Sequence, residues 1–221
     1  MAERIDREYY DSTTYFEAAP HLVDRDSRFQ RYRIRMVESL ARPRPQDRVV
    51  DLGCGWGTFE FALADRVSWI TGVDFSTRSI AFCQEALSRD PKTNVTFLCA
   101  DAGATGLPAA EADLVVAADL FEHLYPEDSE RVTREAFRLL RPGGRFAVWT
   151  PHRGHILEIL KNNGILLRPD PTHVDYKSMD RVNGLLERAG FAIFSALERL
   201  LGRWIPVLRR RIAVLGIKPR E

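Results

Sequence analysis

The chain has 221 residues, of which 45% are hydrophobic and 29% are charged, and its formal net charge is +1. This composition is that of a globular protein with one domain, and the near-neutral charge excludes an overall field that attracts nucleic acid or an anionic membrane. The three cysteines form no CxxC pair, which argues against a disulfide framework, so we expect reduced thiols in a cytoplasmic protein. A charged N-terminus and the lack of a long apolar run predict neither a secretory signal nor a membrane span.

Short apolar runs alternate with amphipathic stretches along the chain. A first helix is predicted over 28–41, where apolar side chains recur at helical spacing: Phe29, Tyr32, Met36, Val37 and Leu40. The RPRP sequence ends this helix, because proline cannot continue the hydrogen-bond ladder. The next strands are predicted at 48–52, 69–74, 94–100, 112–119 and 145–150. Helices are predicted between them at 58–66, 77–89 and 127–140.

Strands joined by helical crossovers predict a mostly parallel sheet with helices on both faces. Two further apolar runs, at 191–200 and 212–218, add closing strands, the last of them antiparallel. The sequence therefore predicts an α/β fold with a Rossmann-like, seven-stranded, mostly parallel sheet. We expect one domain over 1–221, divided into an N-terminal helical lid (1–45), a ligand-binding core (46–150), an insertion (151–190) and closing strands (191–221).

The stretch GCGWG, at 53–57, follows the first predicted strand and precedes a helix. Glycine allows backbone torsions that other residues resist, and it lets a ligand lie against the chain. Asp51 lies at the carboxyl end of the strand, where open α/β sheets bind their ligands. A tight strand-to-helix turn needs the same glycines, so this stretch alone leaves both interpretations open.

Two further carboxylates favour a nucleotide ligand. Asp74 ends the second strand, where a carboxylate can accept both hydroxyls of a ribose. Asp101 follows the third strand, where a carboxylate can accept from an exocyclic amino group. A nicotinamide dinucleotide would also use Asp74, but its GxGxxG fingerprint requires glycine or alanine at the position of Thr58.

Five motifs resemble, in order and spacing, those of class I S-adenosylmethionine-dependent methyltransferases of the small-molecule type, which include the ubiquinone-pathway O-methyltransferases. They are VVDLGCGWGTF, GVDFS, CADA, ADLVVAADLFEHL and LRPGGRFAVWTP, and the resemblance extends from about Val49 to Phe191. The resemblance implies an enzyme with S-adenosyl-L-methionine as its cofactor. Carried over by position, Asp51 and the loop residues Gly53, Cys54 and Gly55 would hold the methionine part of that cofactor.

The same resemblance assigns the nucleoside contacts. Asp74 would accept the ribose hydroxyls and Phe75 would pack against the adenine. Asp101 and the backbone N–H of Ala102 would bind the adenine edge. Asp119, just past the fourth strand, would lie near the methionine end and the transferred methyl group.

A hydroxyl acceptor loses its proton during methyl transfer, to a base or through metal coordination. The run DLFEHL, at 119–124, brings Asp119, Glu122 and His123 to the carboxyl edge of the predicted sheet. If a helical turn begins at Asp119, Asp119 and Glu122 share a face of it. We expect His173 to return from the insertion to the same edge, so that His123 or His173 acts as the base beside Asp119.

The same four residues resemble the metal ligands of small-RNA 3′-terminal 2′-O-methyltransferases, where a carboxylate-xx-Glu-His run and a distant histidine hold a divalent ion. By that resemblance, Asp119, Glu122, His123 and His173 would bind Mg²⁺ or Mn²⁺. This chain departs from those enzymes in having Asp119 where they have glutamate, and its insertion does not otherwise match an RNA-binding region. A metal-free helix start is the alternative interpretation.

Aromatic and imidazole side chains in the lid and the insertion are candidates for binding the methyl acceptor. They are Tyr9, Tyr10, Tyr15, Phe16, His152 and His155. An apolar helix predicted near 156–160 would cover a pocket for an aromatic or lipid-linked small molecule. The alternative is that the lid aromatics pack onto the core.

Residues 199–220 contain seven basic residues and no acidic one, with apolar side chains between them. Such a stretch can rest on an anionic membrane as a peripheral contact, or it can form a solvated connection between strands.

The main prediction is therefore methylation of a small-molecule hydroxyl. Methylation of nitrogen or carbon, 2′-O-methylation of RNA ends and a catalytically silent, cofactor-binding regulatory subunit are the alternatives. The chain reads DLFE where base N-methyltransferases have an NPPY-like sequence, and no basic, aromatic groove precedes the core. Both features argue against a nucleic-acid partner. The sequence leaves the oligomeric state open.

Overall fold

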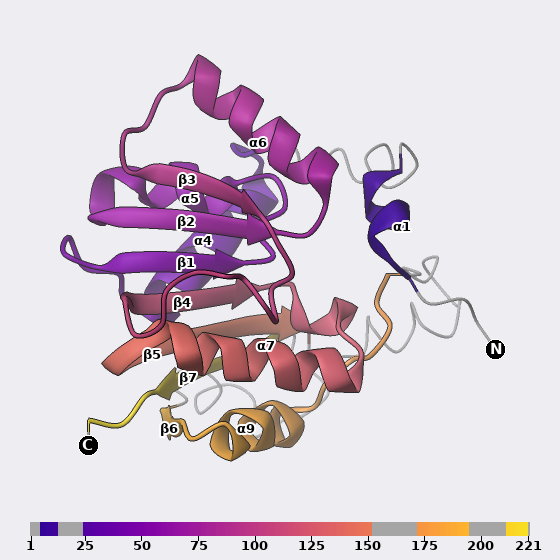
Figure 1. The fold of residues 1–221 in the computed structure, drawn as a ribbon, viewed down its shortest axis with the longest axis vertical. Coiled ribbons are helices and arrows are strands. Elements are labelled where there is room, and N and C mark those ends of the chain that lie inside the picture. Colours follow the sequence, from indigo (N-terminus) through magenta and orange to yellow (C-terminus); the bar gives the residue numbers. More distant parts are fainter. Residues whose placement is uncertain (1–4, 13–23, 152–171, 195–210, 221) are drawn as a thin grey trace.

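The computed structural model describes residues 5–12, 24–151, 172–194 and 211–220. Its centre is a seven-stranded sheet in the order β3-β2-β1-β4-β5-β7-β6 (Figure 1). The strands are β1 (Arg48–Leu52), β2 (Trp69–Asp74), β3 (Val95–Cys99), β4 (Ala112–Ala118), β5 (Leu140–Pro151), β6 (Ala192–Phe194) and β7 (Arg211–Ile217). Strands β1 to β5 pair in parallel, whereas β7 pairs antiparallel with β5 and β6. The predicted α/β class with a mostly parallel sheet and an antiparallel last strand is confirmed.

The helices begin where the sequence provides caps. They are α1 (Arg7–Asp11), α4 (Arg28–Ala41), α5 (Thr58–Leu63), α6 (Thr77–Arg89), α7 (Pro126–Leu139) and α9 (Met179–Arg188), with the 3₁₀ turns η1 (Ala64–Arg66) and η2 (Phe121–His123). Ser27, Ser76 and Ser178 each accept a hydrogen bond from the backbone N–H three residues later. Pro126 opens α7, where its missing N–H costs nothing.

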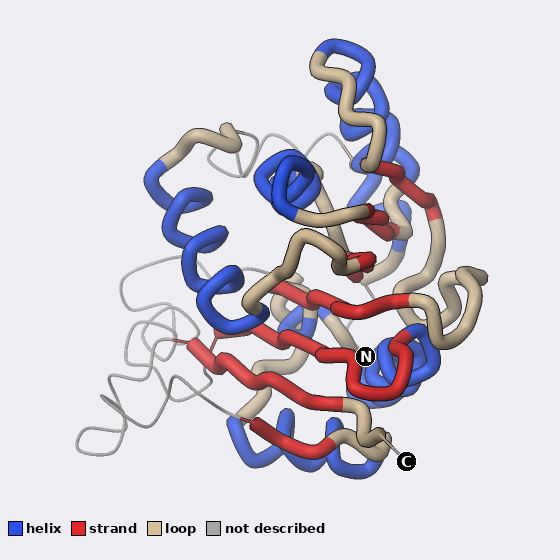
Figure 2. The backbone as a smooth tube through the Cα atoms, turned by 90° about the vertical axis from the view of Figure 1, so that its left-hand side faces the viewer, coloured by secondary structure: helices blue, strands red, loops and turns tan. Residues whose placement is uncertain are grey.

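Alternation along the strands gives the sheet two apolar faces. Leu114 and Val116 of β4 pack with α4 and α5, while Val115 and Ala117 pack with α7 and α9. Figure 1 shows α7 in front of the sheet and α4 and α5 behind it, and Figure 2 shows helices on either side of the strands. Each fully buried valine or leucine contributes about 1.5–3 kcal/mol, so these faces hold the layers together.

Two predicted elements differ in detail from those observed. Tyr32, expected on the buried face of α4, is 46% exposed, and the buried residues of that helix are Gln30, Val37, Leu40 and Ala41. Strand β5 begins at Leu140 instead of residue 145, because Leu140 pairs with Ala112 across a register shift in β4. Of the strand predicted at 191–200, the described part forms β6 over Ala192–Phe194.

No helical turn begins at Asp119, so the helical face that Asp119 and Glu122 would share on such a turn does not form. Strand β4 ends at Ala118, Asp119 has a left-handed backbone with φ of 53°, and η2 begins only at Phe121. The Asp119 N–H still donates to the Trp149 carbonyl at 2.7 Å, so the ladder to β5 continues while the chain turns. An aspartate tolerates this conformation better than most residues. Asp119 and Glu122 therefore share no helical face.

Within the described parts of the chain, the helices are too short or too polar to cross a lipid bilayer.

Candidate active site

The glycine stretch forms a tight loop between β1 and α5. Gly53, Gly55 and Gly57 all have positive φ, at 77°, 52° and 72°. A Cβ at Gly53 would lie 2.9 Å from Leu120 Cδ1, and one at Gly57 would lie 3.0 Å from the ring of Phe97. At Gly55 a Cβ would meet open space, and this residue lines a cavity of about 380 Å³. The glycines therefore serve both the turn itself and the approach of a ligand.

The cavity lies at the carboxyl ends of β1, β2 and β4, under α1. All the residues that sequence predicted for cofactor binding line it, apart from Asp51: Gly53, Cys54, Gly55, Asp74, Phe75, Asp101, Ala102 and Asp119. Asp74 accepts from the backbone N–H groups of Gly55 and Ser76, both at 2.9 Å, which fixes its carboxylate at the wall. Burial raises the pKa of Asp74, and these backbone bonds oppose the rise.

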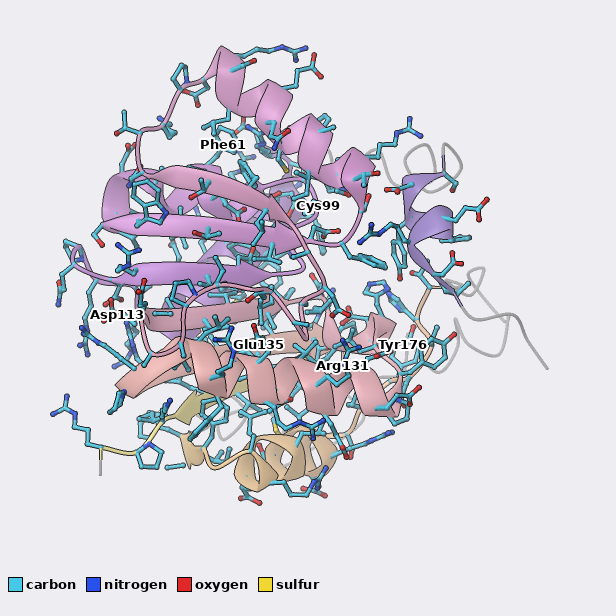
Figure 3. The ribbon with its side chains drawn as sticks, in the orientation of Figure 1. Phe61, Cys99, Asp113, Arg131, Glu135 and Tyr176 are labelled. Carbon is cyan, nitrogen blue, oxygen red and sulfur yellow. The ribbon has the colours of Figure 1, made fainter. Side chains whose placement is uncertain are left out.

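Asp101 lies at the far end of the cavity and is positioned by α7. Its carboxylate accepts from the Gly103 N–H at 2.7 Å and from Arg131 Nη2 at 2.7 Å. Figure 3 labels Arg131 on α7, on the side of the molecule where the strands end. Arg131 also lines the cavity, and sequence reasoning missed it. Its signal is weak, because a charged residue on an amphipathic helix usually faces solvent.

Asp51 lies beneath the loop, 1% exposed, instead of in the cavity wall. Its neighbour is Glu60 of α5, which is fully buried. Burial raises the pKa of Asp51 to about 7, opposed by the positive charge of Arg33, and burial beside Asp51 raises the pKa of Glu60 well above its ordinary value. Burial beside Asp51 therefore favours the neutral form of Glu60.

Asp119 is held by two arginines that sequence reasoning did not identify. Arg33 Nε donates to one carboxylate oxygen at 2.8 Å and Arg211 donates to the other. Arg33 lies over the ring of Phe59 and Arg211 over that of Trp149. Arg33 follows Gln30 on the buried stripe of α4, and polar residues on that stripe were the available signal.

Glu122 of η2 is 1% exposed and faces the end of β5. Its Oε2 accepts from the Thr150 hydroxyl at 2.8 Å. Burial, together with the negative charge of Asp119, raises the pKa of Glu122 to about 8. Glu122 is therefore largely protonated at pH 7.

His123 is the imidazole in the cavity wall. Its Nδ1 lies 3.0 Å from the Thr172 carbonyl oxygen and 3.2 Å from the Tyr10 hydroxyl. A carbonyl oxygen only accepts, so Nδ1 carries the proton and Nε2 carries the lone pair. The Tyr10 ring also packs edge to face against Phe75, with ring centroids 5.2 Å apart. Tyr10 of the lid therefore contacts both Phe75 and His123, which line the cavity.

His173 returns to this edge, as the sequence predicted. Its ring centroid lies 4.9 Å from that of His123, and its Nδ1 lies 2.5 Å from the Tyr176 hydroxyl. Ligand atoms of Glu122, His123 and His173 lie within 4.8 Å of one another. Asp119 is outside this group, because its oxygens are bound by arginines, so the predicted four-residue metal set does not fit.

The remaining predicted acceptor residues fall into two groups. Tyr15, Phe16, His152 and His155 lie outside the described residues. Tyr9 lies in α1 against Tyr10, with ring centroids 5.8 Å apart, and does not line the cavity. Of the basic stretch 199–220, two described residues bind protein groups: Arg211 binds Asp119, and Lys218 donates to backbone carbonyls of α7 and β5.

Known proteins are similar to this chain in sequence. Residues 49–144 match the family described as a methyltransferase domain. A protein of Mycolicibacterium smegmatis named "probable S-adenosylmethionine-dependent methyltransferase" is 29% identical over 192 residues, which are 87% of this chain and 70% of that protein. The ubiquinone biosynthesis O-methyltransferase of Pseudomonas entomophila is 30% identical over 143 residues, 62% of this chain and 60% of that enzyme.

The fold is also that of a solved methyltransferase. The Haemonchus contortus phosphoethanolamine N-methyltransferase 2, in complex with phosphomonomethylethanolamine and S-adenosylhomocysteine, gives a TM-score of 0.74 at 16% identity. The match covers 97% of this chain and 60% of that one. The chain thus spans less than two thirds of the length of these last two proteins.

Proposed function

Because the chain belongs to the class I S-adenosylmethionine-dependent methyltransferases, we propose that it methylates a hydroxyl group of a small molecule, with His123 as the general base. The observation that carries the proposal is the bond between His123 Nδ1 and the Thr172 carbonyl, which leaves the basic lone pair on Nε2 of an imidazole in the cavity wall. The O-methyltransferase among the relatives supports a hydroxyl acceptor.

The residues around the cavity fit the cofactor. The loop at Gly53 and Gly55 leaves room for a ligand, and the carboxylates of Asp74 and Asp101 suit ribose hydroxyls and an adenine amino group. Phe75 offers a ring to a base, and Arg33 offers a cation to a carboxylate. When bound, S-adenosylmethionine supplies an electrophilic methyl group on a positively charged sulfur.

The part of this chain in the reaction is to align the acceptor and remove its proton. His123 Nε2 takes the hydroxyl proton, and the imidazolium that forms keeps its Nδ1–H bond to the Thr172 carbonyl. Alignment of donor and acceptor accounts for much of the acceleration of such a displacement. Acid–base catalysis by a positioned group contributes about 10²- to 10⁴-fold.

The proposal is tested with a set of acceptors and methyl-labelled donor. Phenols, catechols and aliphatic alcohols are each paired with the amine that has nitrogen in place of oxygen, and the products are identified by mass spectrometry. We expect O-methyl products, formed equally well in excess chelator, because the proposed base is the His123 imidazole, which donates Nδ1–H to the Thr172 carbonyl. Methylation of the amines alone, no product from any acceptor, or activity lost to chelator and restored by Mg²⁺ or Mn²⁺ would each contradict the proposal.

A further inference from the structure

The segment 172–177, which returns from the insertion, binds the turn η2 along its length. The Thr172 carbonyl receives the His123 Nδ1–H bond at 3.0 Å. The Asp175 N–H donates to the Glu122 carbonyl at 3.2 Å. These two bonds attach the backbone of the segment to the turn that carries the base. The proposed function above uses His123, but it does not explain what keeps η2 in place.

The side chain of Lys177 adds further hydrogen bonds between this segment and the turn. Its side chain is 0% exposed, and its Nζ donates to the carbonyls of Phe121 and, at 2.6 Å, Leu124. The carboxylate of Asp175 lies 3.4 Å from the same Nζ. The Phe121 carbonyl also accepts from the Leu124 N–H at 3.3 Å, and a carbonyl oxygen can accept two hydrogen bonds. A buried carbonyl that lacks a partner is costly. The ammonium of Lys177 satisfies both carbonyls, one on each side of His123.

The burial of a lysine side chain requires a structural explanation. Removing an ammonium from water is unfavourable unless it is paired and hydrogen-bonded, and burial lowers the pKa of Lys177 to about 8. Most fully buried side chains of this fold are apolar, and an apolar residue would fill the same space without this cost. The hydrogen bonds to the carbonyls of Phe121 and Leu124 therefore explain why a lysine is buried at this position.

We propose that Lys177 is a positioning residue for His123: by binding the Phe121 and Leu124 carbonyls, it holds η2 so that His123 presents Nδ1–H to Thr172 and Nε2 to the cavity. This inference rests on the proposed role of His123 as base. It assigns Lys177 no contact with acceptor or cofactor, since Lys177 is absent from the cavity wall.

The chain contains a matched control. Lys218 donates in the same way to two carbonyls three residues apart, those of Phe137 at 2.9 Å and Leu140 at 2.8 Å. It follows β7 and contacts the C-terminal end of α7 and the start of β5, whereas the cavity lies at the carboxyl ends of β1, β2 and β4. Lys218→Met removes the same chemistry without touching η2.

The test reads the tautomer of His123 by NMR in the full chain labelled with ¹⁵N-histidine. Spectra are recorded at about pH 7.5, above the ordinary pKa of histidine and below that of Lys177. In the wild type we expect one His123 signal set with the proton on Nδ1. In Lys177→Met we expect the two ¹⁵N shifts of His123 to move toward each other, as the tautomers mix. Lys218→Met retains the wild-type His123 shifts.

Binding of S-adenosylhomocysteine and the unfolding transition are measured for both variants to confirm the fold. Lys177→Leu, which also lacks an N–H donor, replaces Lys177→Met if the latter does not fold. Unchanged His123 shifts in the variant that folds, or equal changes in Lys218→Met, would overturn the assignment. The readout needs no acceptor: a tautomer lost in Lys177→Met together with full methyl transfer by His123→Gln would refute the base and retain the positioning role.

Discussion

Among single residues, Asp74 is the carboxylate whose contribution to cofactor binding can be measured most directly. It accepts two backbone N–H groups at the cavity wall and faces the space that the ribose would occupy. We predict that Asp74→Asn weakens S-adenosylhomocysteine binding about 10- to 100-fold, the usual effect of losing hydrogen bonds to a charged group. Calorimetry measures it. Asp180→Asn, at an exposed position of α9, serves as the control, and equal affinity of the two variants would refute the ribose assignment.

Glu122 is expected to make the stability of the protein depend on pH. Its pKa is raised to about 8 in the fold, whereas in the unfolded chain it is about 4.3. Between these values the folded state binds more protons than the unfolded state, so the contribution of Glu122 to stability falls as pH rises. Glu122→Gln resembles the protonated form and does not titrate. We predict that it is more stable than the wild type at pH 7, by up to about 3 kcal/mol.

Urea unfolding at several pH values measures this difference. The stability gain of Glu122→Gln over the wild type grows from about pH 4.5 to about pH 8 and is constant above that range. Glu187→Gln, an exposed position on α9, shows no such trend. A gain independent of pH would show that Glu122 is ionised in the fold.

Asp119 shows what residue types alone do not specify. Sequence supplied a carboxylate beside Glu122 and His123, and that composition suggested a metal site. The structure gives Asp119 a left-handed backbone and two arginine partners, one from α4 and one from β7. Those arginines come from positions 33 and 211, and no local pattern connects them to residue 119. Ion pairs between residues so far apart in the sequence cannot be predicted from the local spacing of residue types.

At the scale of elements, α1 covers the cavity and is fastened at both ends. Asp11 accepts from the Ser76 hydroxyl at 2.6 Å, the Thr77 hydroxyl at 2.8 Å and the Arg78 N–H at 3.1 Å, at the start of α6. At the other end, the Ile5 N–H donates to the Tyr125 hydroxyl at 3.2 Å. A lid held in this way slows the release of a ligand beneath it.

We predict that Asp11→Asn raises the dissociation rate of S-adenosylhomocysteine about tenfold, because charge-assisted bonds to α6 are weakened. Stopped-flow displacement measures the rate. Glu8→Gln removes a carboxylate from the exposed side of the same helix and leaves the rate unchanged. Identical rates in Asp11→Asn and wild type would mean that α1 does not limit ligand release.

Elements were predictable where periodicity was strong. The runs at 48–52 and 69–74 form β1 and β2 within those bounds, and α6 and α7 lie within one residue of their predicted ends. The predicted face of α4 was wrong at Tyr32, since an aromatic ring at helical spacing is not by itself buried. The short β6 and the turn η2 depend on pairing and capping from distant segments, which propensity does not encode.

At the scale of the whole molecule, the order of motifs determined the sheet, because each strand–helix repeat has one favourable handedness. The same order brought Asp74, Asp101 and the glycine loop to one edge, so the part of the cavity proposed for the cofactor was predictable. The acceptor side was not. The proposed acceptor side combines Tyr10 from the lid, His123 from η2 and Thr172 from the segment after the insertion, and only the fold brings these three together.

The central claim is that His123 removes the acceptor proton while the rest of the chain binds the cofactor. The most direct test measures the methyl-transfer rate and S-adenosylhomocysteine affinity of the wild type and of His123→Gln, using the best hydroxyl acceptor. We expect kcat to fall about 10²- to 10⁴-fold in His123→Gln, with unchanged affinity for S-adenosylhomocysteine. A His123→Gln enzyme that transfers methyl groups at the wild-type rate would contradict it.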